Sequence, residues 1–264
     1  MLNKAPEITA LFWVIKILTT GMGESASDWL LNRGEGLPGL GVVGALVIDV
    51  TIFVVALALQ FVVRRHVPAV YWFAVAAVAI FRTVAADVVH FLVGVPLWLT
   101  TTAYAGALAV NFGFWYRGER TLSIHSIDTR RRETFYWITV FFTFALGTAL
   151  GDLTAMVWNL GFLASGVMFI ILILVPAVAH LRFGANAILA FWSAYVLTRP
   201  LGASFADWLA VPPAQRGLDL GAGWVTLVST IVIVVLVAYV AASQNSHHRG
   251  QIATRRQAAK KATT

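Results

Sequence analysis

Six carboxylates lie inside long apolar stretches of this sequence, where charged side chains are rare. They are Glu24, Asp28, Asp49, Asp87, Asp152 and Asp207. An aspartate costs about 2.5–3.5 kcal/mol at the centre of a helix inserted into a membrane. Intramembrane acids therefore face the protein interior, and they commonly bind or carry ions and protons. We expect these residues to mark the functional part of the molecule.

Four of the aspartates share one spacing. Each lies fifteen residues after a tryptophan that itself follows an aromatic residue; the pairs are Trp13/Asp28, Trp72/Asp87, Trp137/Asp152 and Trp192/Asp207. If equivalent positions of four units face one axis, the four carboxylates meet at one depth. A ring of acids at that depth attracts cations.

Hydroxyl and carboxylate oxygens share a helix face near this depth. Residues four apart lie on the same face, so Glu24 joins Asp28 and Thr148 joins Asp152. Hard divalent cations prefer such oxygen ligands. The sequence thus predicts a cation or metal site of Asp28, Asp87, Asp152 and Asp207, supported by Glu24, Asp49 and Thr148. The alternative for each acid is structural, as a helix-end cap or an ion-pair partner.

Basic groups in the same stretches can pair with the acids or control access to them. Arg82 and Arg199 are too central to reach water, so each should pair with Asp87, Asp207, Asp49 or another unit's aspartate. Lys16 has the alternative of extending its ammonium toward the inner membrane surface.

Two neighbouring features fit this picture. His90 follows Asp87 by three residues and is either a hydrogen-bonded interior residue or a metal ligand or proton relay. Pro200, next to Arg199, interrupts helix hydrogen bonds and frees carbonyl groups, so this region is the best candidate for a moving element.

The elements that position these residues follow from composition. Of 264 residues, 59% are hydrophobic and 12% are charged, against about 45–50% and about 25% in soluble domains. The apolar stretches are about 20 residues long, the length of a spanning helix, whereas barrel strands alternate apolar and polar residues. The predicted fold class is therefore an all-α integral membrane protein. The absence of cysteine excludes disulfides and thiolate metal sites.

Eight apolar stretches are separated by turn residues, and each predicts a transmembrane helix. They cover residues 8–31, 40–63, 70–94, 97–116, 135–155, 160–180, 187–209 and 222–242. Fourteen of the nineteen basic residues flank one side of the predicted bundle: Lys4, Arg64, Arg65, Arg117, Arg120, Arg130, Arg131, Arg132, Arg182, Arg249, Arg255, Arg256, Lys260 and Lys261. By the positive-inside rule, this side and both termini are cytoplasmic, in a cell inner membrane.

The odd-numbered stretches repeat one pattern. Each begins with an aromatic pair, and we expect the tryptophans Trp13, Trp72, Trp137 and Trp192 to be interfacial anchors. Three of the four stretches also contain Thr-x-x-x-Gly, a pattern that allows close helix packing. The pairs are Thr19/Gly23, Thr143/Gly147 and Thr198/Gly202.

On these motifs the sequence resembles bacterial membrane proteins built from four tandem copies of a repeat of unknown function, each with two transmembrane helices and a characteristic tryptophan. The resemblance covers residues 8 to about 243 and is strongest over residues 119–152. It implies an architecture and no activity.

The predicted units are residues 1–64, 65–118, 119–182 and 183–244, followed by a basic disordered cytoplasmic tail at 245–264. Because each unit contains two spans, all four have the same orientation, which gives parallel repeats around an axis near the membrane normal. The expected arrangement is a pseudo-fourfold ring or two pseudo-twofold halves.

Two functions are compatible with the sequence. The leading hypothesis is a transporter or permeation pathway for a small cation, such as a divalent metal, with or without proton coupling. The alternative is a non-transporting scaffold, sensor or assembly factor whose acids and bases form structural ion pairs. No nucleotide-binding loop, metalloprotease motif or catalytic triad is recognisable, so we expect no enzyme activity. The expected partners are the lipid bilayer and the cation, with no nucleic acid; a bound divalent cation is the one cofactor suggested, and a homo-oligomer is left open.

Overall fold

The computed structural model describes the backbone of residues 4–31, 41–87 and 94–262, and the side chains of residues 4–31, 43–81 and 94–244. Throughout these residues the regular structure is helical, with no β-strand. The eight α-helices are α1 (Ala10–Leu30), α2 (Gly41–Val62), α3 (Pro68–Asp87), α4 (Leu97–Glu119), α5 (Arg130–Asp152), α6 (Phe162–Phe183), α7 (Ala187–Ala210) and α8 (Ala222–Ala262). The all-α prediction is confirmed.

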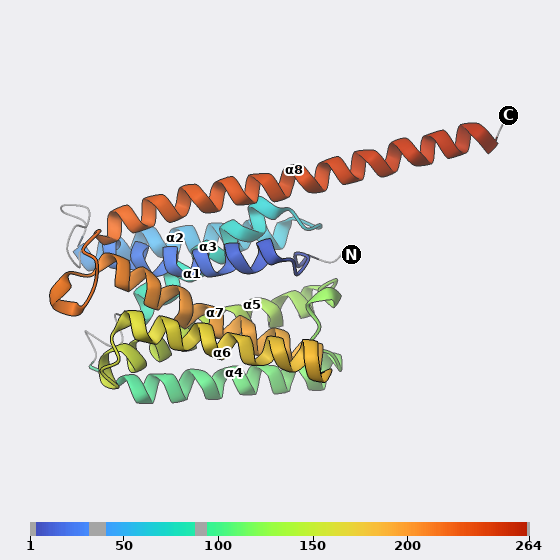
Figure 1. The fold of residues 1–264 in the computed structure, drawn as a ribbon. Helices are drawn as coiled ribbons and strands as arrows, with labels where there is room; N and C mark the ends of the chain where they lie inside the picture. Colours follow the sequence, from blue (N-terminus) through green and yellow to red (C-terminus); the bar gives the residue numbers. More distant parts are fainter. Residues whose placement is uncertain (1–3, 32–40, 88–93, 263–264) are drawn as a thin grey trace.

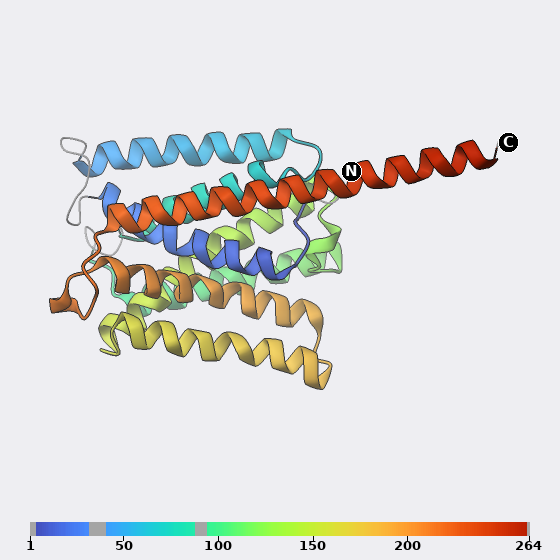
Figure 2. The ribbon, with the colours of Figure 1, turned by 45° about the horizontal axis from the view of Figure 1, so that its top comes forward.

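The helices are arranged in two concentric sets. The odd-numbered helices form a closed inner set in which α1 contacts α3 and α7, and α5 contacts the same two helices. Each even-numbered helix packs mainly on the odd helix that follows it: α2 on α3, α4 on α5 and α6 on α7. The last helix, α8, returns to pack on α1 (Figures 1 and 2). The second helix of each two-helix unit therefore covers the first helix of the next.

Apolar surface faces outward from the even-numbered helices. Val54 of α2, Leu174 of α6 and Val235 of α8 are each more than half exposed. Four segments are long and apolar enough to cross a membrane: Val43–Val62, Arg130–Val157, Phe162–Phe183 and Ala222–Gln244.

The sequence predicts eight membrane-spanning helices. Among the described residues, four helices meet the length and hydropathy expected of a membrane span. Helices α1 and α7 carry Lys16, Glu24, Asp28, Arg199 and Asp207, and these charged residues reduce their hydropathy. Both helices lie in the inner set, where they face other helices. An inner helix can therefore be more polar than one that faces lipid.

The tryptophans at the start of the odd helices are core residues. Trp72, Trp137 and Trp192 are each 5% exposed or less, and Trp13 is half-buried. Trp72 packs against Phe12, and Trp137 packs against Tyr71. The aromatic pairs turn inward and pack between the four inner helices. The role of these four residues as interfacial anchors stays a prediction.

The glycines of the Thr-x-x-x-Gly pattern allow close helix contacts, as predicted. A Cβ atom on Gly23 of α1 would lie 2.5 Å from the Cβ of Ala79 in α3. A Cβ on Gly147 of α5 would collide with the Arg199 side chain, and one on Gly202 of α7 would lie 2.6 Å from the Ile17 carbonyl oxygen. The threonines Thr19, Thr143 and Thr198 are buried and donate hydrogen bonds to carbonyls of their own helices, at Ile15, Val140 and Tyr195.

The C-terminal segment differs from expectation. Residues 245–262, predicted to be a disordered tail, continue α8 as one helix that projects from the bundle (Figure 1). The segment is rich in alanine, glutamine, arginine and lysine, which have high intrinsic helix propensity. Because of this propensity, the helical conformation of the apolar part of α8 continues into the basic segment.

Candidate cation site

A cavity of about 610 Å³ lies at the C-terminal ends of α1 and α7 and beside the end of α5. Five carboxylates line it: Glu24, Asp28, Asp152, Asp207 and Asp219. Its remaining lining includes Met156, Phe162, Pro212 and Gln215, among other residues of the α5–α6 and α7–α8 connections. The lining of the cavity therefore combines five acidic side chains with mostly apolar residues.

Three of the four aspartates predicted to converge meet in this cavity. Asp28, Asp152 and Asp207 come from α1, α5 and α7, which are neighbours in the inner set. The fourth, Asp87, is the last residue of α3, and its side chain lies outside the described residues. Glu24, predicted to support the ring, lines the cavity as expected. Asp219, in the connection before α8, is an acid that the repeat spacing misses.

Arg199 forms an ion pair with Glu24, one of the carboxylates that line the cavity. Its side chain is completely buried, and Nη2 donates to Glu24 Oε2 at 2.7 Å and to Thr148 Oγ1 at 2.9 Å. Nη1 donates to the Thr20 carbonyl oxygen. Arg199 thus links three inner helices, α7, α1 and α5. The sequence predicts an ion pair for Arg199 with an aspartate; the pair found here is with Glu24.

Lys16 lies next along the axis. Its side chain is completely buried, and Nζ lies 3.7 Å from the centroid of the Phe144 ring and 4.3 Å from that of Tyr195. Among the described residues Nζ has no hydrogen-bond partner. The alternative in which Lys16 extends to the membrane surface is therefore wrong, because the side chain is enclosed between aromatic rings.

The remaining predicted residues divide between two places. Asp49 of α2 is buried but does not line the cavity, and within the described part of the chain neither of its carboxylate oxygens has a partner. The side chain of Arg82 and the whole of His90 lie outside the described residues. Thr148 contacts Arg199, so its role here is to position a guanidinium.

A direct metal centre is not formed by the described side chains. No three His, Cys, Asp or Glu residues among them are close enough to hold a metal ion together. The prediction of a metal site at Asp28, Asp152 and Asp207 gains no support from this part of the chain. An ion in a cavity of this size would keep water in its coordination shell and interact with the carboxylates at longer range.

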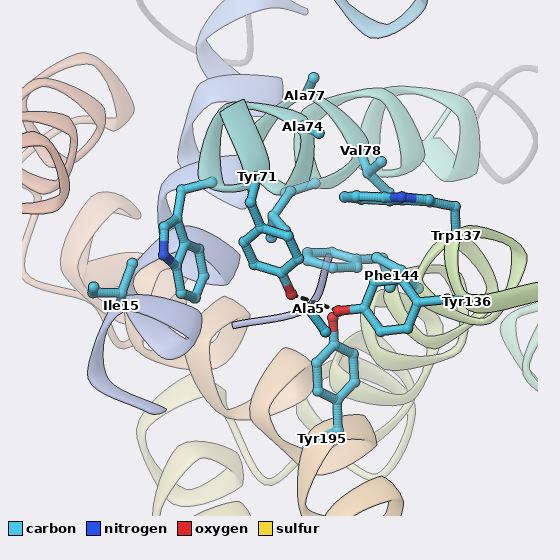
Figure 3. Close-up of a cluster of buried hydrophobic side chains, with 14 of the residues drawn as sticks. Ala5, Ile15, Tyr71, Ala74, Ala77, Val78, Tyr136, Trp137, Phe144 and Tyr195 are labelled. Atoms are coloured by element: carbon cyan, nitrogen blue, oxygen red, sulfur yellow. Dashed lines mark hydrogen bonds between the residues drawn. The ribbon is translucent and has the colours of Figure 1, made fainter. Parts of the chain in front are cut away.

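The opposite end of the inner set is filled by tyrosines and the N-terminal segment. The Tyr71 and Tyr136 hydroxyls are 2.5 Å apart, and the Tyr195 hydroxyl points to the same place, next to Ala5 (Figure 3). Lys4 is buried and forms an ion pair with Glu133 at 2.8 Å. The repeated aromatic pair is the feature of the sequence that marks this region.

Further bonds attach the N-terminal segment to the bundle. Lys4 Nζ donates to the carbonyl oxygen of Gln60, and the Gln60 side chain donates to Glu133. His66, in the connection before α3, hydrogen-bonds the Lys4 carbonyl oxygen at 3.1 Å. Burial lowers the pKa of His66 below its ordinary value of 6.5, although the Lys4 carbonyl acts in the opposite direction.

Comparison with protein families identifies four consecutive matches to one family, described as Repeat of Unknown Function (DUF347). They cover residues 11–66, 70–121, 135–186 and 190–246. The chain belongs to this repeat family. The four matches correspond to the four two-helix units, which confirms the predicted repeat. No curated protein and no solved structure shows significant similarity to the chain.

Proposed function

We propose that this repeat protein spans the inner membrane with eight helices in a pseudo-fourfold arrangement and conducts a small cation along the axis of the inner set. The cyclic packing supports the symmetry, because every even helix covers the next odd helix and α8 completes the cycle on α1. The outward apolar faces of α2, α6 and α8 support contact with lipid.

The distribution of charge supports the orientation. The carboxylate cavity is at the C-terminal ends of the odd helices. Basic residues occur at the other end, in the connections that contain Arg64 and Arg120 and at the start of α5. By the positive-inside rule the basic end faces the cytoplasm, so the cavity opens to the exterior.

The convergence of Glu24, Asp28, Asp152 and Asp207 in one cavity is the observation that carries the transport proposal. Carboxylates gathered between low-dielectric walls raise the local concentration of cations. The absence of a compact ligand set among the described residues favours an ion that stays partly hydrated. A monovalent or divalent cation fits this chemistry better than an anion or a neutral solute.

Arg199 is the expected gate. Its ion pair with Glu24 separates the cavity from the buried interior, and Pro200, which follows it inside α7, removes one backbone hydrogen bond from the helix. A cation that binds Glu24 competes with the guanidinium for the same carboxylate. Displacement of Arg199 would then open the floor of the cavity toward Lys16 and the tyrosines.

The second candidate is a non-transporting scaffold or sensor. The two buried ion pairs, Arg199–Glu24 and Lys4–Glu133, favour it, because pairs of this kind can hold helices in a fixed arrangement. In this case the acidic cavity would not transport cations.

Cation flux into vesicles that contain the purified protein distinguishes the two candidates. With Mn²⁺ as the probe, the wild-type protein should conduct, and Asp152→Asn should reduce flux by about tenfold or more because it removes a cavity charge. Asp128→Asn is the matched control, since Asp128 is partly exposed at the opposite end in a pair with Arg132 and should leave flux unchanged. Equal flux in the wild type, Asp152→Asn and empty vesicles would leave the scaffold as the better account.

A further inference from the structure

Lys16 is a buried basic residue that does not line the carboxylate cavity. Its Nζ is enclosed by the rings of Phe144 and Tyr195 and has no hydrogen-bond partner among the described residues. A protonated amine in contact with ring faces is attracted to their π electrons. That attraction does not depend on a fixed acceptor, so Lys16 can gain or lose a proton without breaking a hydrogen bond of the described structure.

Several ionisable groups surround Lys16 on the neighbouring helices. Helix α7 contributes Tyr195 and Arg199, and the Arg199 guanidinium carbon lies 5.3 Å from the centroid of the same Phe144 ring. Helix α3 contributes Tyr71 from its described side chains, and α5 contributes Tyr136, both in the hydroxyl cluster (Figure 3).

The remaining ionisable groups belong to other parts of the bundle: Asp28, Asp152 and Asp207 line the cavity, and Glu133 is paired with Lys4. On α8, Tyr239 is the ionisable residue of the part with described side chains, and it is exposed. On α1 itself, Glu24 lies about two turns further along and is paired with Arg199.

Charge balance distinguishes Lys16 from Arg199. The Arg199 charge is compensated by Glu24, and the other carboxylates nearby, Asp28, Asp152 and Asp207, line the cavity. The Lys16 ammonium therefore has no carboxylate partner of its own among the described residues. Arginine stays protonated in proteins and cannot release this charge, whereas lysine can. When a cation binds Glu24 and displaces Arg199, the positive charge beside Lys16 increases further.

We propose that Lys16 is the coupling residue, which releases a proton when the cavity takes up a cation. This inference rests on the proposed cation transport. In the step, one N–H bond of the Lys16 ammonium breaks, the amine keeps the electron pair, and the proton leaves through the opened cavity to water at the outer end. A proton taken up from water at the inner end, by way of the tyrosine hydroxyls, then restores the ammonium and expels the cation inward, so one proton leaves for each cation that enters. The Tyr71 and Tyr136 hydroxyls are hydrogen-bonded to each other, and the Tyr195 hydroxyl points toward them (Figure 3). The Tyr195 ring also lies against Lys16 Nζ, so these hydroxyls are the groups placed to relay the returning proton.

The test uses the purified full-length chain in vesicles that contain a pH-sensitive dye, with Mn²⁺ added outside. In the wild type, Mn²⁺ entry should be accompanied by proton exit, and an imposed pH gradient should drive Mn²⁺ movement. Lys16→Met, which keeps the length and apolar stem of the side chain, should bind Mn²⁺ within about twofold of wild type but lose gradient-driven flux by about tenfold or more. Lys16→Gln serves the same purpose if the methionine variant does not fold.

The outcomes separate the two proposals. Proton movement in Lys16→Met or Lys16→Gln at the wild-type ratio to Mn²⁺ would overturn the role of Lys16 and leave cation transport intact. Mn²⁺ flux in the wild type without proton movement would also overturn it. An absence of Mn²⁺ flux in the wild type would instead refute the proposed function on which this inference rests.

Discussion

Glycine at three positions lets the inner helices approach one another more closely than any other residue would permit. Gly23 lies against α3, Gly147 lies against Arg199 and Pro200 of α7, and Gly202 lies against α1. The contact at Gly147 brings the α7 backbone close enough to α5 for Arg199 to hydrogen-bond Thr148. Close packing at the residue scale therefore sets the position of the guanidinium that pairs with Glu24.

Gly202→Ala should destabilise the folded protein by about 1–3 kcal/mol, the usual cost of adding a methyl group to a packed core. The new Cβ would lie 2.6 Å from the Ile17 carbonyl oxygen, and α1 and α7 would have to separate. Gly106→Ala is the matched control, because Gly106 of α4 faces open space and alanine has the higher helix propensity. Unfolding in detergent followed by circular dichroism should show a loss for the first variant and no loss for the second; equal stability of both would contradict this packing.

Single residues also show what the sequence could and could not predict. The Thr-x-x-x-Gly spacing correctly marks the close contacts, because small residues four apart share a helix face. The Trp-to-Asp interval places three acids in one cavity, whereas the same interval does not predict that Trp72, Trp137 and Trp192 are buried. Hydropathy cannot distinguish a tryptophan that is buried between helices from one at the membrane interface, since a tryptophan near a helix end is compatible with both environments. The Lys4–Glu133 pair joins residues far apart in the chain, and no local spacing encodes it.

At the scale of elements, the N-terminal segment acts as part of the core. Lys4 and Ala5 are buried, and Lys4 connects the end of α2 to the start of α5 through Gln60 and Glu133. Ala5 lies beside the tyrosine hydroxyls (Figure 3). The segment therefore seals the inner set at the end opposite the carboxylate cavity.

Glu133→Gln should lower stability by about 3–5 kcal/mol, because it leaves the buried Lys4 ammonium without its counter-charge. Replacing both partners, in Lys4→Met with Glu133→Leu, should restore most of the loss, since no buried charge then remains. The unfolding temperature of the purified protein measures both effects. A single variant as stable as wild type would show that the ion pair does not hold the segment in place.

At the scale of the whole molecule, the repeat produces a closed assembly from four similar units. Because each even helix covers the following odd helix, the units interlock, and α8 on α1 completes the cycle. The repeated acids of the odd-numbered stretches predict which helices lie inside, because charged residues in apolar helices are shielded by neighbours. Asp49 of α2 is the exception, since it is a buried acid on an outer helix.

The chain contains no cysteine, so one introduced thiol reports the topology without background. His125 and Gln215 are exposed residues at the two ends of the bundle. In intact cells a membrane-impermeant maleimide should label Gln215→Cys, and it should label His125→Cys only after the membrane is permeabilised. Labelling in the reverse order would place the acidic cavity in the cytoplasm and refute the orientation.

Direct binding of Mn²⁺ to the purified protein tests the central claim, that the carboxylate cavity holds a cation. Electron paramagnetic resonance of free Mn²⁺ should reveal saturable binding to the wild type and to Asp128→Asn. The double variant with Asp152→Asn and Asp207→Asn should lose affinity by about tenfold or more, because each substitution removes one charge from the cavity while preserving side-chain shape. Unchanged saturable binding in the double variant, or no saturable binding in the wild type, would contradict the account.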